Sequence, residues 1–143
     1  MSYSLYIEPA AEEDLKELLN SGSSRDKKAA DLILVTLEEI AGDKDFLSRM
    51  YRRGQTRIGS TTSDTDQITR YWRAGKNILR LKFWDFPEEG GALLPWRAIY
   101  AYDAQYNAYH VLGIINRDAN YDKDDTKFQR ILNDYDALGI PTY

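Results

Sequence analysis

The chain has 143 residues, of which 43% are hydrophobic and 29% charged, a composition typical of one globular domain with a sizeable core. It has no cysteine and a single histidine, His110, which excludes disulfides, thiolate nucleophiles and metal sites built from cysteines or several histidines. No run of about 18 apolar residues is present, and the N-terminal MSYSLYIEP lacks the pattern of a signal peptide. We therefore expect a cytoplasmic protein that does not cross a membrane.

The formal net charge of −4 is unevenly distributed along the chain. Residues 44–82 contain ten lysines and arginines but only three aspartates, a local charge of +7 that leaves −11 for the rest. A chain divided in this way can present a basic face to a polyanion. The alternative is that the two regions neutralise each other across the fold.

The N-terminal part of the chain predicts a strand followed by two antiparallel helices. Apolar and polar residues alternate over 3–8, as in a half-buried strand. Pro9 opens the first helix where its missing N–H costs nothing, and Asp14 is one of three acidic residues expected near the positive end of the helix dipole. The second helix begins after a cap at Ser23 or Ser24. Both helices are expected to pack on a sheet through apolar stripes: Ala11, Leu15, Leu18 and Leu19 in the first, and Ala30, Ile33, Leu34, Leu37, Ile40 and Ala41 in the second.

The middle of the chain predicts less regular structure. Apolar residues within 46–51 predict one or two helical turns. The small and polar residues of 54–66 predict a mobile loop, and residues 67–72 predict a strand that turns back through 74–77. Residues 87–95 predict a long connection into the next strand.

The strand predicted over residues 77–86 has two distinct faces. Leu79, Leu81 and Phe83 share one face. If that face packs on the helices, Arg80 and Lys82 lie side by side on the open face. The alternative is that these charges only keep a surface strand soluble.

A β-hairpin is predicted at the centre of the sheet over residues 96–121, where two runs rich in β-branched and aromatic residues flank a turn at AQYN. Arg97 opens its first strand and Arg117 closes its second, so antiparallel pairing places the two guanidiniums close together. A phosphate is a suitable counter-ion because its oxygens match the guanidinium fork. The alternative is that each arginine pairs with a nearby carboxylate, with Asp103 and Asp118 as the candidates.

A last helix is predicted after Asp122, which is expected to cap it, and it ends at Gly139 and Pro141. Its apolar residues recur at helical spacing: Phe128, Ile131, Leu132, Tyr135 and Leu138. The face of the sheet that packs on the helix pair is expected to include Leu79, Leu81, Phe83, Ile99, Leu112 and Ile114. Together these elements predict an α+β fold in one domain, residues 1–143.

The element order, together with ILRLKF (78–83), WRAIYAYD (96–103) and VLGIINRDANY (111–121), resembles the RelE/ParE superfamily of bacterial toxins, in particular its RelE-like members. The resemblance implies an N-terminal strand and helix pair packed on an antiparallel sheet meander, with a C-terminal helix. Residues 43–76 and 86–95 are then insertions in this chain, which is longer and more acidic than ribosome-dependent members usually are.

The resemblance also implies a function and a site. RelE-like toxins are metal-independent endoribonucleases that cut messenger RNA, commonly on the ribosome, and no cofactor is expected. The site residues that match the family pattern are Arg80 and Lys82 on the second strand, Arg97 on the third, Arg117 at the end of the fourth and Tyr121 shortly after it. The arginines would hold the scissile phosphate, and one of the basic pair or Tyr121 would transfer protons. Tyr121 could instead stack on a base or pin the last helix through its hydroxyl.

Two alternatives belong to other classes of protein. A ParE-like protein would bind DNA gyrase and carry out no chemistry, and a catalytically silent member of the superfamily would do neither. In the nuclease and the gyrase interpretations a cognate antitoxin is expected to bind, commonly by laying a strand or an amphipathic helix over the sheet or the helix pair.

Overall fold

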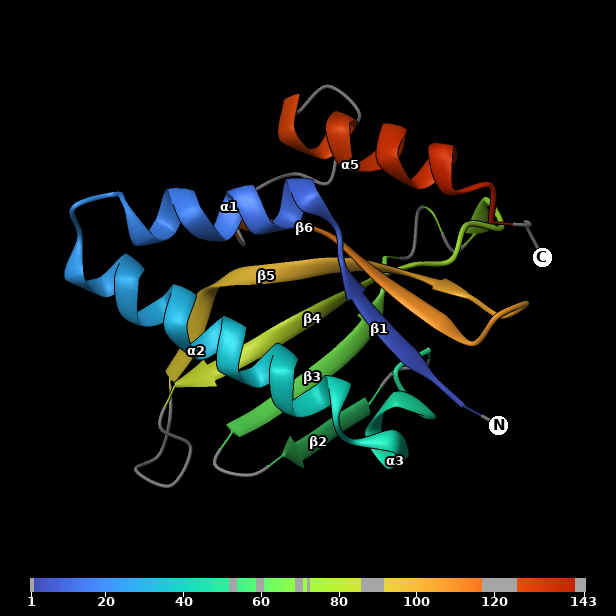
Figure 1. Cartoon of the computed structure of the whole chain (residues 1–143), viewed down its shortest axis with the longest axis horizontal. Helices are drawn as coiled ribbons and strands as arrows, with labels where there is room; N and C mark the ends of the chain where they lie inside the picture. Colours follow the sequence, from blue (N-terminus) through green and yellow to red (C-terminus); the bar gives the residue numbers. More distant parts are fainter. Residues whose placement is uncertain are drawn as a thin grey trace.

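A computed structural model of the chain describes residues 2–51, 54–58, 61–68, 71, 73–85, 92–116 and 126–140. These residues form an α+β fold in which helices pack on both faces of one six-stranded sheet (Figure 1). In chain order the elements are β1 (Ser4–Ile7), α1 (Pro9–Leu19), α2 (Ser24–Ala41), α3 (Lys44–Leu47), β2 (Gly54–Ile58), β3 (Thr61–Gln67), β4 (Ile78–Asp85), β5 (Ala92–Asp103), β6 (Ala108–Asn116) and α5 (Thr126–Leu138). Within the described ranges, no helix combines the length and the apolar character needed to span a membrane.

The sheet has the strand order β1-β6-β5-β4-β3-β2. Strands β2 to β6 form an antiparallel meander, and β1 joins it by pairing parallel to β6. The predicted hairpin is confirmed, because β5 and β6 pair around a turn at residues 104–107. The last turn residue, Asn107, has a φ of +51°, a conformation that asparagine tolerates better than most residues. Because β6 lies between β1 and β5, and β5 lies between β6 and β4, both strands of the hairpin are in the interior of the sheet.

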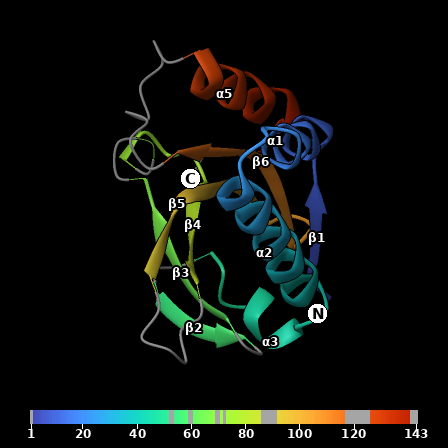
Figure 2. The same ribbon diagram turned by 90° about the vertical axis from the view of Figure 1, so that its left-hand side faces the viewer.

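Local sequence signals start the first two helices as predicted. Pro9 occupies the first turn of α1. The Ser23 side chain caps α2 by accepting a hydrogen bond from the Asp26 N–H at 3.3 Å. Gly42 follows the last residue of α2 as its C-cap. Both helices lie on the same face of the sheet (Figure 2).

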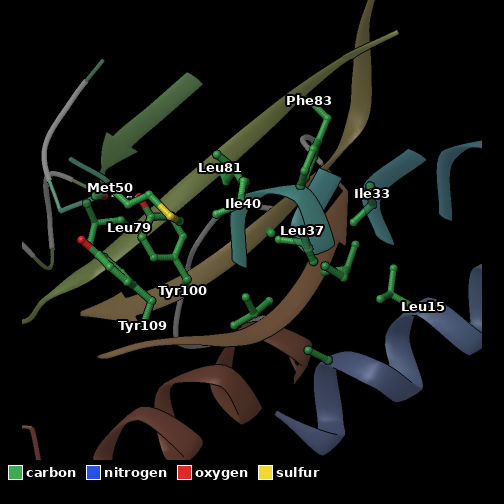
Figure 3. Close-up of a cluster of buried hydrophobic side chains, with 14 of the residues drawn as sticks. Leu15, Ile33, Leu37, Ile40, Met50, Leu79, Leu81, Phe83, Tyr100 and Tyr109 are labelled. Carbon is green, nitrogen blue, oxygen red and sulfur yellow. Dashed lines mark hydrogen bonds between the residues drawn. The ribbon is translucent and has the colours of Figure 1, made fainter. Parts of the chain in front are cut away.

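The larger core lies between this helix pair and the sheet (Figure 3). Its largest members come from α2, α3 and the sheet: Ile33, Leu37, Ile40, Leu47, Met50, Leu81, Phe83, Tyr100 and Tyr109. The hydroxyls of Tyr100 and Tyr109 donate hydrogen bonds to the carbonyls of Met50 and Leu47, so they bind the α3 segment to the sheet. Leu34 and Ala41, which were predicted in the buried stripe of α2, are instead exposed.

A second core lies on the opposite face of the sheet, under α5. Phe128, Ile131 and Tyr135 of α5 pack there against the sheet residues Ile78, Ile99, Ala101, Leu112 and Ile115. The prediction that Ile99 and Leu112 face the helix pair is therefore wrong. Ile99 alternates with Ala98 and Tyr100, which face the helix pair. Leu112 is displaced from simple alternation by a bulge in β6.

The predicted mobile loop over residues 54–66 is also wrong, because its described part forms β2 and most of β3. The segment offers one large apolar residue, Ile58, so apolar periodicity gave no strand signal. Its strands instead extend the ladder from β4, whose edge would otherwise present unpaired N–H and C=O groups. Main-chain pairing, to which threonine is well suited, decides the structure here.

Two predicted strand boundaries, the end of β3 and the start of β5, differ from those in the structure. The strand predicted over 67–72 ends at Gln67, and the Tyr71 N–H donates a hydrogen bond to the Ile68 carbonyl at 2.9 Å. Both of these apolar side chains then reach the second core. The connection predicted over 87–95 is shorter, because β5 already begins at Ala92; residues 86–91 lie outside the described residues.

The two-core architecture predicts where truncation destabilises the fold. Leu81→Ala removes a side chain that is fully buried between α2 and the sheet, and it should lower the free energy of unfolding by about 2–5 kcal/mol. Leu34→Ala is the matched control, since Leu34 is 36% exposed, and it should lower this free energy by under about 1 kcal/mol. Urea denaturation measures both. Equal losses in the two variants would contradict the assignment of Leu81 to the core.

Tyr109 predicts a specific loss of stability in alkali. Burial, followed by the nearby hydroxyls of Tyr102 and Tyr3, raises the pKa of Tyr109 far above its ordinary value of about 10. The unfolded chain then loses this proton at lower pH than the folded protein, so the stabilisation is complete below about pH 10 and falls as the pH rises further.

Tyr109→Phe removes both this ionisation and the hydrogen bond to the Leu47 carbonyl. The variant should be less stable than the parent at pH 8, by roughly 1 kcal/mol, and the difference should shrink between about pH 9.5 and pH 11. Tyr106→Phe, at a side chain that is 70% exposed, is the control whose stability should run parallel to that of the parent. A pH-independent difference for Tyr109→Phe would contradict the prediction.

Candidate functional site

The strand register places three of the predicted site residues on one face of the sheet. Lys82 of β4 lies directly across from Arg97 of β5, and Arg80 lies across from Ile99. Residues directly opposite in an antiparallel pair share a face, with Cβ atoms about 4.5–5.5 Å apart, and diagonal neighbours are roughly 7–8 Å apart. All three side chains are half-buried. Arg80, Lys82 and Arg97 are called the basic face below.

The basic face points away from α1 and α2. Leu81 and Phe83 alternate with its two β4 residues and lie in the larger core, so the cations are on the other side of the sheet. Among the described helices only α5 packs on that side, over Ile78 and Ile99 and on to β6. Figure 2 shows α5 at one end of the sheet, with β3 and β4 extending beyond it.

The remaining two predicted site residues, Arg117 and Tyr121, lie outside the described residues, as does Asp118. The described part of β6 ends at Asn116, one residue after Ile115, which lies across the ladder from Arg97. The prediction that Arg97 and Arg117 lie together therefore stays a prediction.

Acidic residues occupy register positions beside two of the three cations. On β3, Asp66 lies across from Arg80 and Asp64 lies across from Lys82. Opposite charges at such positions stabilise a sheet modestly. Arg80 and Arg97 both take part in interactions within the chain. Arg80 and Lys82 therefore each have an aspartate at an opposite position on β3, whereas the positions opposite Arg97 carry Lys82 and Ile115.

Asp103 does not serve as the carboxylate partner of Arg97. It is six residues from Arg97 along β5, which corresponds to about 20 Å. Its carboxylate instead accepts a hydrogen bond from the Gln105 N–H at 3.0 Å in the turn that follows.

Arg97 differs from the other two cations in its cross-strand neighbours. The two positions across the ladder from it carry Lys82 on β4 and Ile115 on β6. Like charges placed directly opposite each other destabilise a sheet. An anion bound between the Lys82 ammonium and the Arg97 guanidinium would relieve this repulsion. These two groups together supply several hydrogen-bond donors for phosphate oxygens.

His110 does not join the basic face. Its Nδ1 lies 2.7 Å from a carboxylate oxygen of Glu8, and its ring stacks on Tyr6 with centroids 5.5 Å apart. It pairs with Ala101, four residues along β5 from Arg97, or about 13 Å away. In the described part of the chain, no group of three or more histidine, cysteine, aspartate or glutamate residues could hold a metal ion.

The structure assigns important contacts to two residues that sequence reasoning missed. Asp14 is only 3% exposed, and its carboxylate accepts two hydrogen bonds from the Arg130 guanidinium, both at 3.0 Å. The prediction that Asp14 acts near the positive end of the α1 dipole is wrong, because its side chain is turned inward. The available signal was its position on the apolar stripe of α1, between Ala11 and Leu18. A carboxylate within such a stripe requires a buried partner.

Comparison of the chain with known protein families, with curated proteins and with solved structures found no match. The resemblance to RelE/ParE toxins therefore stays a prediction from the sequence. Support for a function comes from the arrangement of the basic face itself.

If the basic face binds phosphate, inorganic phosphate should stabilise the folded protein. At a phosphate concentration ten times its Kd, the free energy of unfolding should rise by roughly 1.4 kcal/mol, which thermal unfolding detects as a higher Tm. Arg97→Gln should remove this increase. Arg49→Gln is the matched control, because Arg49 pairs with Asp45 beside α3, in a segment whose apolar side chains enter the other core. Equal increases in both variants, or in sodium chloride of the same ionic strength, would contradict a phosphate site.

Proposed function

We propose that this protein is the toxin of a toxin–antitoxin pair and acts as a metal-independent endoribonuclease on messenger RNA. The observation that carries the proposal is the direct juxtaposition of Lys82 and Arg97 on the side of the sheet opposite α1 and α2, with Arg80 as a diagonal neighbour. These are the three described members of the residue set that resembles the RelE pattern. The proposal thus joins a geometric observation to a sequence resemblance.

The chemistry requires little from the protein. RNA supplies its own nucleophile, the 2′-OH, which attacks the adjacent phosphate while the 5′-oxygen of the next nucleotide leaves. The protein holds the chain in line and stabilises the negative charge that develops on the phosphate oxygens. Arg97 suits the scissile phosphate because its planar fork can bind two oxygens at once. Lys82 adds a second positive charge beside it, and Arg80 neutralises the neighbouring backbone.

Proton transfer falls to Lys82 or to Tyr121, since a guanidinium does not give up its proton in proteins. The single histidine is occupied with Glu8 at the opposite end of the strand pair and takes no part. Tyr121 lies outside the described residues, and its role comes from the sequence resemblance alone.

The proposed partners are messenger RNA on the ribosome and a cognate antitoxin, both in the cytoplasm. An antitoxin that lays a strand or an amphipathic helix over the sheet or the helix pair would have two kinds of surface available. Leu34 and Val35 on the outer side of α2 are 36% and 48% exposed, and they support a contact at the helix pair.

Induced expression of matched variants tests the proposal. Arg97→Ala should reduce RNA cleavage by about 10²–10³-fold, the usual effect of losing one group that stabilises the transition-state charge. Arg97→Lys should restore only part of the activity, because a point charge cannot replace the bidentate contact. Arg49→Ala, the control, should remain as toxic as the parent. Mapping of RNA ends measures cleavage, growth measures toxicity, and denaturation confirms that each variant is folded.

Three results would contradict the nuclease. Full toxicity of Arg97→Ala would separate the basic face from the activity. Toxicity with intact messenger RNA and altered plasmid supercoiling would favour the ParE-like interpretation, in which the target is DNA gyrase. An absence of toxicity in the parent would favour a catalytically silent member of the superfamily.

A further inference from the structure

Strand β6 continues past the end of its neighbour β1. The parallel pairing stops at Ile7, which lies across from Val111, and the Glu8 N–H makes a last hydrogen bond to the Val111 carbonyl. Beyond this point the chain of β1 turns into α1, while β6 runs on to Asn116. The main-chain groups of β6 on that side therefore need other partners.

Two side chains take the place of the missing strand. The Ile114 N–H donates a hydrogen bond to the Asp14 carboxylate at 2.9 Å. The Arg130 guanidinium donates to the Leu112 carbonyl at 3.1 Å. Asp14 and Arg130 also bind each other through two hydrogen bonds of 3.0 Å. Together Asp14 and Arg130 form what we call the β6 clamp, which joins α1 and α5 across the edge of β6.

The β6 clamp lies at the bulge of β6. Across the β5–β6 ladder, Ile99 pairs with Gly113 while the next residue, Tyr100, pairs with Val111, so Leu112 is the extra residue. One extra residue reverses the alternation of a strand. After the bulge, Ile114 faces the larger core and Ile115 faces the α5 side, where it lies across from Arg97.

The bulge also depends on close packing by α5. A Cβ added to Gly113 would lie 2.6 Å from Nη2 of Arg130 and 2.7 Å from Cδ1 of Ile131. A side chain at position 113 would therefore require the Arg130 guanidinium and the end of the Ile131 side chain to shift. The hydrogen bond to Asp14 raises the pKa of Arg130 further above its high ordinary value, so the guanidinium stays charged in the clamp.

We propose that Asp14 and Arg130 are positioning residues for the basic face. By holding the bulge at Leu112 they fix which β6 residue lies across from Arg97. That residue is Ile115, three positions beyond Leu112 along β6. The β4–β5 register places Lys82 on one side of Arg97, and the β6 register held by the clamp places Ile115 on the other side. The effect on RNA rests on the function proposed above, whereas the effect on register does not.

Arg130→Gln tests the positioning role, because a glutamine cannot bind Asp14 and the Leu112 carbonyl together. The matched control is Lys127→Gln: the Lys127 ammonium lies 3.4 Å from the Asp14 carboxylate, but its ion pairs among the described residues are with Asp14 and Glu17 of α1 and not with β6. Asp14→Asn is the conservative variant, since its amide oxygen still accepts the Ile114 N–H. Arg130→Lys keeps the charge beside Asp14 and provides a folded variant if Arg130→Gln does not fold.

The first measurement is the set of cross-strand nuclear Overhauser effects. Arg130→Gln should lose those between Arg97 and Ile115 while keeping those between Leu5 and Tyr109, which lie at the other end of β6. Lys127→Gln and Asp14→Asn should keep both sets. Retained Arg97–Ile115 contacts in a folded Arg130 variant, or their equal loss in Lys127→Gln, would overturn the proposal.

The second measurement is the affinity for a short fluorescein-labelled single-stranded RNA. Affinity should fall at least tenfold in Arg130→Gln and stay near that of the parent in Asp14→Asn and Lys127→Gln. If the parent and Arg97→Ala bind this RNA equally, the proposed function fails, and the register measurement still decides the role of the clamp. If RNA binding depends on Arg97 but not on Arg130, the positioning role fails while the proposed function stands.

Discussion

The buried ion pair between Asp14 and Arg130 is the interaction on which the rest of the structure depends. Removing a carboxylate from water is unfavourable by several kcal/mol unless paired charges and hydrogen bonds offset it, and removing one partner of such a pair typically destabilises a protein by about 3–5 kcal/mol. Here the Asp14 carboxylate is satisfied by the guanidinium, by the nearby Lys127 and by a main-chain N–H of β6. Three segments that are distant in sequence must therefore be in place together before the carboxylate is compensated.

This constraint explains how one sheet carries two separate cores. Helix α1 belongs to the larger core and α5 to the smaller one, yet the two helices meet at the edge of β6 (Figure 1). The bulge lets consecutive parts of β6 serve both cores, since Val111 and Ile114 face the helix pair while Leu112 and Ile115 face α5. Without the extra residue, regular alternation would place Val111 and Ile114 on opposite faces of the sheet, and likewise Leu112 and Ile115.

Burial on both faces also limits where a function can reside. The inner strands β5 and β6 are covered over much of their length, and the basic face borders the second core, with Arg80 across from Ile99 and Arg97 across from Ile115. Lys82 and Arg97, both half-buried, lie directly opposite each other there, and an anion bound between them would reduce their repulsion. The proposed reaction fits such a face, because self-cleavage of RNA needs positioned positive charge more than a titrating histidine. In the arrangement proposed here, the clamp fixes the β6 residue that lies beside Arg97, while the β4–β5 pairing fixes Lys82 on its other side.

Short-range signals in the sequence determined several helix ends, the turn of the hairpin and the faces of β4. Pro9, Ser23 and Gly139 begin or end helices through local backbone geometry, and residues 104–107 form the expected turn. The placement of Arg80 and Lys82 on one side of β4 follows from alternation within a single strand. These features require no knowledge of distant parts of the chain.

Other features required the tertiary structure, because their causes lie far apart in sequence. Strands β2 and β3 form by pairing with β4 and have no apolar pattern of their own. Arg97 joins Lys82 only through the register between β4 and β5. The sides of the sheet on which Ile114 and Ile115 lie depend on the bulge at Leu112, where side chains of α1 and α5, 116 residues apart, bind the β6 backbone. Alternation predicts faces only while a strand remains regular, and here a buried ion pair between distant helices decides where that regularity stops.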